Sequence, residues 1–145
     1  MSDASADPAR DPARIVVGVD GSETSRLALR RAAVEATAHG ARLQVVHAWN
    51  YLDQHGTQFD PHYGEAKATA NAEQLVTDVL GSDRPADVVI TVVNDHPTPA
   101  LLGAAAGAFT LVVGARGLGG FKSLMLGSVS HHVVQHAPCP VLVVR

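Results

Sequence analysis

The chain has 145 residues, of which 46% are hydrophobic and only 4% aromatic, and its formal net charge is −3. This length suits one domain with a core of aliphatic side chains. The negative charge and the lack of a Lys or Arg stripe argue against nucleic-acid binding. The single cysteine, Cys139, cannot form an internal disulfide and suits the cytoplasm, and no stretch has the length of an apolar membrane span.

The first predicted elements follow a polar start. Residues 1–14 are rich in Asp and Pro, so we expect a disordered tail, followed by one domain over residues 15–145. The continuous apolar run Ile15–Val19 predicts a strand that is covered on both faces. Asp20–Glu23 predicts a turn and a helix start, and Gly40 is typical of the residue that ends a helix.

The rest of the chain alternates between strand and helix patterns. In order, we expect a strand over 43–48, a surface loop without an assigned role over 49–64, a helix from Ala68 to about Gly81, a strand over 88–93, a short helix capped by Thr98 with Pro99 at its first position, a strand over 110–113, a helix beginning at Ser128 and a strand over 140–144. This alternation predicts an α/β fold with an open, mainly parallel sheet and helices on both faces. Ligands in such sheets bind beyond the carboxyl ends of the strands.

Glycines gather after one of these buried strands. The run 111–113 leads into Gly114 and Gly117, and nine residues later Gly127 and Ser128 open a helix. Glycine lets the backbone approach an anion, and a helix start supplies N–H donors. Tight turns between buried elements are the alternative, but the full spacing at this sheet edge favours a phosphate site.

Three segments together resemble the universal stress protein family, and the likeness runs from Ile15 to Arg145. The family's signature Gly-x2-Gly-x9-Gly-Ser/Thr is met by the glycine cluster and Ser128. The starting segment Val17–Ser22 and the ending segment His136–Val144 also read as this family.

The resemblance implies a Rossmann-like fold, similar to that of adenine nucleotide alpha hydrolases, with one five-stranded parallel sheet in the order 3-2-1-4-5. It also implies that ATP, with Mg²⁺ bridging its phosphates, binds between the first and fourth strands, and that the chain forms a homodimer through its last strand. The nucleotide-binding residues that it implies are Gly18, Val19, Asp20, Ala48, Val113, Gly114, Arg116, Gly117, Gly127, Ser128, Val129 and Ser130. From the residues alone, Asp20 could equally cap a helix and Arg116 could equally be solvated.

The function that follows is an ATP-binding regulatory or stress-response module in the cytoplasm, with slow ATP hydrolysis at most. The sequence has no P-loop ending and no evident catalytic base, so we do not expect an enzyme. Two alternatives remain: a dimeric interaction module with a vestigial nucleotide site, and a weak ATPase or autophosphorylating enzyme with Ser128 or Ser130 as acceptor.

Histidines near the C-terminus have the spacing of a helical metal chelate. His132 and His136 stand four residues apart, and His131 precedes them. No acidic residue lies between the pair to complete a metalloprotease motif, so solvated or packed histidines are the favoured interpretation. His47, at a predicted strand end, is likewise interpreted as structural.

Overall fold

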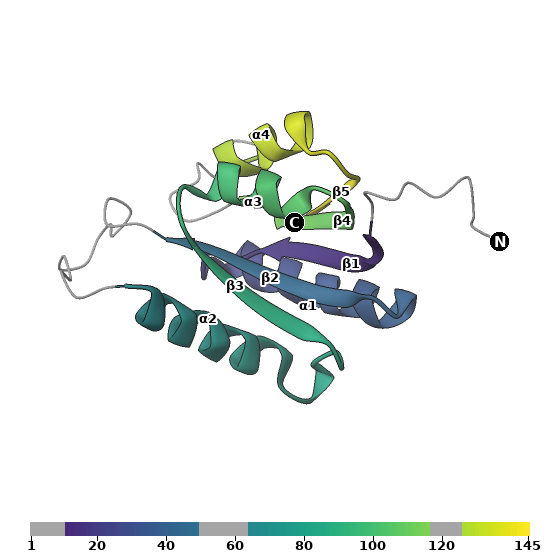
Figure 1. Ribbon diagram of the computed structural model, residues 1–145, viewed down its shortest axis with the longest axis vertical. Helices are drawn as coiled ribbons and strands as arrows, with labels where there is room; N and C mark the ends of the chain where they lie inside the picture. Colours follow the sequence, from purple (N-terminus) through teal and green to yellow (C-terminus); the bar gives the residue numbers. More distant parts are fainter. Residues whose placement is uncertain (1–10, 50–63, 117–125) are drawn as a thin grey trace.

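A computed structural model describes residues 11–49, 64–116 and 126–145. Its strands are β1 (Asp11–Gly18), β2 (Arg42–Trp49), β3 (Val88–Asn94), β4 (Ala108–Gly114) and β5 (Val141–Val144). Its helices are α1 (Glu23–His39), α2 (Glu65–Leu80), α3 (Pro97–Ala105) and α4 (Ser128–His136), and a short 3₁₀ helix, Gly81–Asp83, follows α2. The strands form one parallel sheet in the order β3-β2-β1-β4-β5, which confirms the expected fold (Figure 1).

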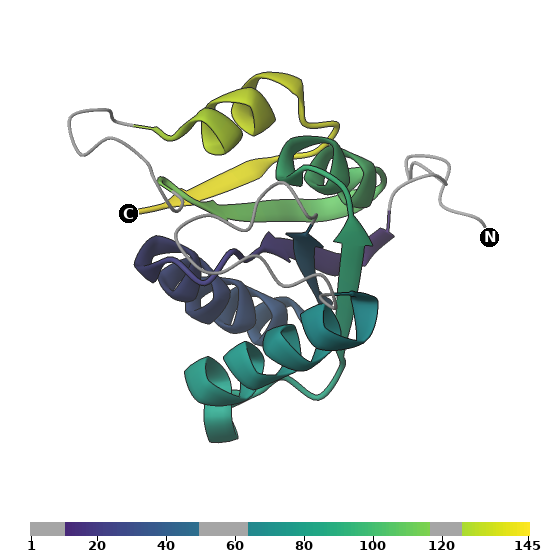
Figure 2. The ribbon, with the colours of Figure 1, turned by 90° about the vertical axis from the view of Figure 1, so that its left-hand side faces the viewer.

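The sheet separates two layers of helices. Figure 2 shows α1 and α2 on one face and α3 and α4 on the other. Ile15 and Val17 of β1 join the core cluster that contains the buried residues of α1, whereas Val16 joins the cluster beneath α3 and α4. Both faces of β1 are therefore buried, which explains its continuous apolar sequence.

The ends of α1 agree with the sequence. Ser22 is the N-cap, and its hydroxyl accepts a hydrogen bond from the Ser25 amide at 3.3 Å. Gly40 ends the helix with φ at 61°, and its N–H donates toward Ala36 O and Thr37 O. Because L side chains rarely adopt this left-handed conformation, glycine is the residue of choice here.

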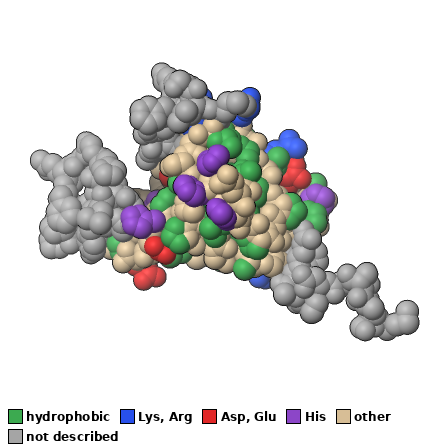
Figure 3. Space-filling model, turned by 90° about the horizontal axis from the view of Figure 1, so that it is seen from above, with side chains coloured by type: hydrophobic (Ala, Val, Ile, Leu, Met, Phe, Trp, Pro, Cys, Tyr) green, Lys and Arg blue, Asp and Glu red, His purple; other side chains and the backbone are tan. Residues whose placement is uncertain are grey.

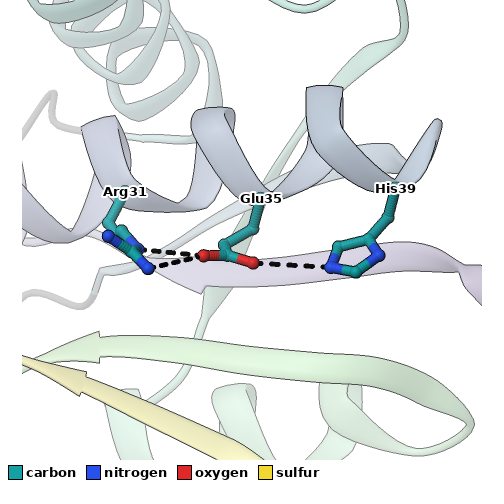
Figure 4. Close-up of polar contacts among 3 residues, drawn as sticks. All are labelled: Arg31, Glu35 and His39. Atoms are coloured by element: carbon teal, nitrogen blue, oxygen red, sulfur yellow. Dashed lines mark hydrogen bonds and ion pairs between the residues drawn. The ribbon is translucent and has the colours of Figure 1, made fainter.

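A network of polar side chains runs along the flank of α1 that faces the β4 side of the sheet (Figure 4). The Arg31 guanidinium lies 2.9 Å from Glu35 Oε1, and His39 Nε2 lies 3.5 Å from Glu35 Oε2. The His39 ring also lies against Phe109 in β4, with 5.1 Å between ring centres. An exposed Arg–Glu pair at this spacing contributes about 0.3–0.5 kcal/mol, and His39 adds an ion pair only when it is protonated, so the network stabilises α1 modestly.

Several element boundaries differ from the sequence-based expectation, among them the starts of α2 at Glu65 and of β4 at Ala108, and three of the differences have a clear physical reason. α3 begins at Pro97 with His96 as its N-cap, so the expectation of Thr98 as cap was wrong. Proline suits the first helical position because it has no N–H to leave unsatisfied, and Pro97 reaches that position before Pro99. Trp49, expected in the loop, is the buried last residue of β2.

The start of β1 also differs, since the strand begins at Asp11 rather than at Ile15. Asp11 aligns with Ala108 of β4, so backbone pairing continues into the polar segment. Arg14 donates to Ala104 O at 2.6 Å and to Ala106 O at 2.7 Å, at the C-terminal end of α3. Residues 11–14 therefore belong to the sheet, and the rest of the expected tail lies outside the described residues.

Candidate functional site

The carboxyl ends of β1 and β4 lie next to each other where the strand order reverses. The chain leaves β1 toward α1 on one face of the sheet, and α4, the next helix after β4, lies on the opposite face (Figure 2). This arrangement opens a crevice at the sheet edge in α/β proteins. The expected site residues of the described segments all come from the strand ends and helix start around this edge.

The segment after β1 is fixed by hydrogen bonds. The Val19 N–H donates to Val46 O at 3.0 Å, and His47 Nδ1 lies 3.1 Å from Val19 O. A carbonyl oxygen only accepts, so the His47 ring donates, which agrees with a structural role. Asp20 Oδ1 accepts from the Ser22 N–H at 2.9 Å, so Asp20 shapes the turn and Ser22 caps the helix.

The end of β4 lies directly against the first turn of α1. A Cβ on Gly114 would lie 2.8 Å from the carbonyl carbon of Thr24 and 2.9 Å from its carbonyl oxygen. The Thr24 hydroxyl also donates to the Arg116 carbonyl oxygen. Gly114 is thus required by the α1 contact even without a ligand. Thr24 is a residue of this site that the sequence pattern did not indicate, because only the return of α1 over the sheet brings it there.

Gly18 is packed in a similar way, but against a side chain. A Cβ on Gly18 would lie 2.8 Å from Leu101 Cδ2 of α3. Ala48 lies at the end of β2, aligned with Val93 of β3, and is half-buried. Both residues stand at the expected edge of the sheet, next to the segment that contains Val19.

Ala115 joins three parts of the site. Its N–H donates to Val144 O of β5 at 2.7 Å, and its carbonyl oxygen accepts from the Gly127 N–H at 2.6 Å. The Ser130 hydroxyl lies 2.9 Å from the same Ala115 oxygen and 3.1 Å from Gly127 O. The start of α4 is therefore fixed beside the end of β4, although the two are separated along the chain.

The two helix starts at this edge differ in their capping. The α1 start is capped by the Ser22 side chain, whereas Gly127 caps α4 without a side chain. The backbone bonds of α4 begin with His131 N–H to Gly127 O at 2.9 Å, so the amides of residues 128–130 have no acceptor within the helix. An uncapped helix start of this kind presents N–H donors and the positive end of a dipole to an anion.

Most of the expected site residues can offer only backbone groups. The Val19 and Val113 side chains are buried in the core, and Val129 packs against the cluster beneath α3 and α4. Ser130 is 3% exposed and its hydroxyl already serves two carbonyl groups, so it is poorly placed as a phosphate acceptor. Gly117 lies outside the described residues.

Three of the expected site residues have polar side chains that are at least partly exposed. Ser128 is exposed at the first position of α4, while Asp20 and Arg116 are half-buried. Of the two serines named as autophosphorylation acceptors, only Ser128 is therefore accessible. The groups at this edge that could recognise an anion are thus mainly backbone amides at the start of α4.

Other features of the described residues lie away from this edge. A surface hollow of about 480 Å³ lies at the amino ends of β2 and β3, where Arg42 Nε lies 2.9 Å from Asp87 Oδ2. It is on the far side from the strand-order reversal and has no part in the site. None of the described helices combines the length and apolarity that a bilayer crossing requires.

Residues 13–145 match the model of the universal stress protein family. A universal stress protein of Mycobacterium tuberculosis is 41% identical over 145 aligned residues, which cover 95% of this chain and 46% of the relative. A universal stress protein of Thermus aquaticus is 38% identical, with 90% of this chain and 97% of the relative covered. The chain thus spans about half the length of the mycobacterial relative and nearly all of the Thermus one.

Solved structures show the same fold. A universal stress protein from Lactobacillus plantarum superposes with a TM-score of 0.75 at 23% identity, covering 94% of this chain and 99% of that one. A universal stress protein solved in complex with cAMP superposes with a TM-score of 0.67 at 29% identity, covering 91% of this chain and 95% of that one.

Proposed function

Because this chain belongs to the universal stress protein family, we propose that it binds an adenine nucleotide at the carboxyl edge of β1 and β4. The observation that carries the proposal is the uncapped start of α4, held beside the end of β4 through Ala115. Amides at such a position bind phosphate groups. The complex of a structural neighbour with cAMP supports an adenine nucleotide as the ligand class.

Within this proposal, ATP is the expected nucleotide. The amides of residues 128–130 bind its phosphates, and the backbone around Gly114 and Ala48 lies beside the ribose and adenine. Mg²⁺ neutralises phosphate charge when it is bound, and it prefers oxygen ligands such as carboxylates and phosphates. Asp20 is the expected site residue that supplies such a carboxylate. The Arg116 guanidinium adds positive charge near the same edge.

The proposed role is regulatory. The donors proposed for the phosphates are backbone amides, and the side chains of Ser130 and His47 are committed to structural hydrogen bonds. Such a site binds phosphate without supplying a base aimed at the terminal phosphoryl group. We therefore propose a nucleotide-responsive module that acts in the cytoplasm, with slow hydrolysis at most.

Replacing Ser128 with proline tests the proposed phosphate contact. Ser128 is the first residue of α4 and Gly127 before it is extended, with ψ at 169°, so proline fits the backbone and removes one N–H. We expect at least about tenfold weaker ATP binding by isothermal titration calorimetry, since a hydrogen bond to a charged group contributes about 1.5–3 kcal/mol. Ser128→Ala, which keeps the N–H, should bind as the parent does.

The calorimetry uses ATP, ADP, AMP and cAMP, each with and without Mg²⁺. Affinity that falls from ATP to AMP supports binding of the phosphate tail at α4. Equal affinity of Ser128→Pro and the parent for ATP, with both folded by circular dichroism, would refute the proposed contact. No binding of any of the four nucleotides would refute the function and would favour the vestigial-site alternative.

The last strand supports a second proposal, a homodimer formed through β5. β5 is an edge strand, and Val141–Val144 are all half-buried apolar residues. Such an edge offers unpaired backbone groups to a second copy. We expect light scattering after size-exclusion chromatography to give twice the chain mass, and Val143→Lys to shift the protein to monomer, with the exposed Val134→Lys as control. A monomeric parent protein would refute this assembly.

A further inference from the structure

Histidines are concentrated on the exposed side of α4, away from the core. His131, His132 and His136 are all exposed, and Figure 3, which looks onto the α3 and α4 side, shows histidine side chains gathered on this face. The atoms immediately around them are hydrophobic or uncharged rather than Lys or Arg. The nucleotide proposal gives these side chains no role.

Two of the rings already lie side by side. The ring centres of His132 and His136 are 6.4 Å apart with 23° between the ring planes. Residues four apart lie on the same helix face, whereas the neighbouring residue His131 points elsewhere and meets His132 edge-on at 84°. The pair therefore comes from helix geometry and does not depend on a loop.

The His132 ring is held in the orientation that metal-binding histidines use. Its Nδ1 lies 2.9 Å from the Ser128 carbonyl oxygen, which can only accept, so Nδ1 carries the hydrogen. In the neutral ring this leaves the lone pair on Nε2. A hydrogen bond from the second ring nitrogen to a backbone carbonyl is the usual support of a ligating imidazole.

We propose that His132 and His136 form a two-histidine binding site for a divalent transition-metal ion on the exposed face of α4. Imidazole suits Zn²⁺, Ni²⁺ and Cu²⁺, in contrast to the oxygen ligands that Mg²⁺ prefers at a nucleotide. No group of three or more His, Cys, Asp or Glu side chains that could hold a metal occurs among the described residues, so water completes the coordination.

Coordination of one ion by both rings requires the ring centres to move closer together. Two Nε2 atoms at about 2.1 Å from a tetrahedral ion place the ring centres roughly 5.3 Å apart, so the rings must approach by about 1 Å. The exposed His136 ring must also turn so that its Nε2 points toward the same ion as Nε2 of His132. A bound ion would also join consecutive turns of α4 and so resist fraying of the helix.

The test uses the untagged protein and Ni²⁺ or Zn²⁺ as the probe. Imidazole ¹H–¹⁵N spectra follow each histidine during the titration, and calorimetry gives the affinity. We expect the His132 and His136 signals to respond at lower metal concentration than the other histidines. His136→Gln keeps the bond between His132 and Ser128 and should weaken binding roughly 100-fold, because the second ligand then no longer binds at high effective concentration.

Two further variants make the result specific. His131→Gln removes an adjacent exposed histidine and should leave the affinity unchanged. Adding Gln135→His to His136→Gln restores a four-residue spacing with His131, and it should recover most of the lost affinity. Unchanged affinity of His136→Gln, or equal responses from all histidines, would overturn the proposal.

Because the experiment contains no nucleotide, its outcome is independent of the proposed function. A rise in the thermal unfolding midpoint of the parent with Zn²⁺, absent in His136→Gln, would be a second supporting result. A rise of equal size in both proteins would count against the site.

Discussion

Replacing Gly114 with alanine is expected to lower the free energy of unfolding by about 3 kcal/mol, the upper part of the range for overpacked sites. The new Cβ would lie 2.8 Å from the carbonyl carbon of Thr24, a distance that real Cβ atoms essentially never show. Because the contact is with backbone, relief requires a shift of α1 relative to β4. Urea unfolding followed by circular dichroism measures this loss.

The same substitution should weaken nucleotide binding, since the shift displaces the chain around Arg116. Gly103→Ala is the matched control, because nothing lies within 4 Å of its new Cβ and it stands exposed within α3. Alanine there should be neutral or stabilising by about 0.5–1 kcal/mol. Gly18→Ala should fall between the two, because the contacted Leu101 methyl groups can move. A Gly114→Ala protein as stable as the parent would contradict the contact between α1 and β4.

Replacing Arg14 with alanine is expected to cost about 2 kcal/mol of stability, because hydrogen bonds from a charged group contribute about 1.5–3 kcal/mol. The Arg14 guanidinium donates to Ala104 O and Ala106 O, which are carbonyl groups at the end of α3, and to Gln44 Oε1 of β2. A cation is also favoured at this end of a helix dipole. Urea unfolding gives the loss, and faster amide hydrogen exchange in α3 locates it.

Arg42→Ala is the control for the Arg14 substitution. Its ion pair with Asp87 joins side chains that are 50% and 57% exposed, so its loss should cost no more than about 0.5 kcal/mol. Equal losses for the two arginine variants would show that Arg14 does not stabilise the end of α3.

The elements that the sequence predicted well are those whose signals are local. The continuous apolar sequence of β1 follows from burial on two faces, and Ser22 and Gly40 mark the ends of α1 by cap chemistry that any helix uses. The start of α4 at Ser128 was predicted in the same way. The strand order came from the family resemblance, because periodicity carries no information on which strands are neighbours.

The boundaries that the sequence missed depend on contacts between distant residues. Asp11 joins β1 because β4 offers a partner at Ala108, and Arg14 is held by the end of α3, about ninety residues away. In His96–Pro99, two prolines compete for the first position of one helix, and local pattern alone does not decide between them.

The structure brings the predicted site residues of the described segments to one edge of the sheet, but it explains two of them by contacts within the fold. Gly114 and Ser130 were assigned to the ligand, whereas the structure explains Gly114 by the contact with Thr24 and Ser130 by hydrogen bonds to carbonyl groups. The spacing of the signature shows neither reason, because each depends on a contact in the folded chain. Gly114 meets Thr24 of α1, and Ser130 bonds the carbonyl group of Ala115 after β4. A ligand role for the backbone of these residues remains a prediction.

Ala115 connects β5 and the start of α4 through its two backbone groups. The N–H of this one residue donates to the outermost strand, and its carbonyl oxygen accepts hydrogen bonds from the first turn of α4 and the residue before it. A displacement of either neighbour is therefore felt by the other through two hydrogen bonds. A ligand that stabilises the start of α4 in this arrangement is therefore expected to stabilise β5 as well. Because thermodynamic coupling is reciprocal, a second copy that binds at β5 should favour ligand binding at α4 by the same free energy.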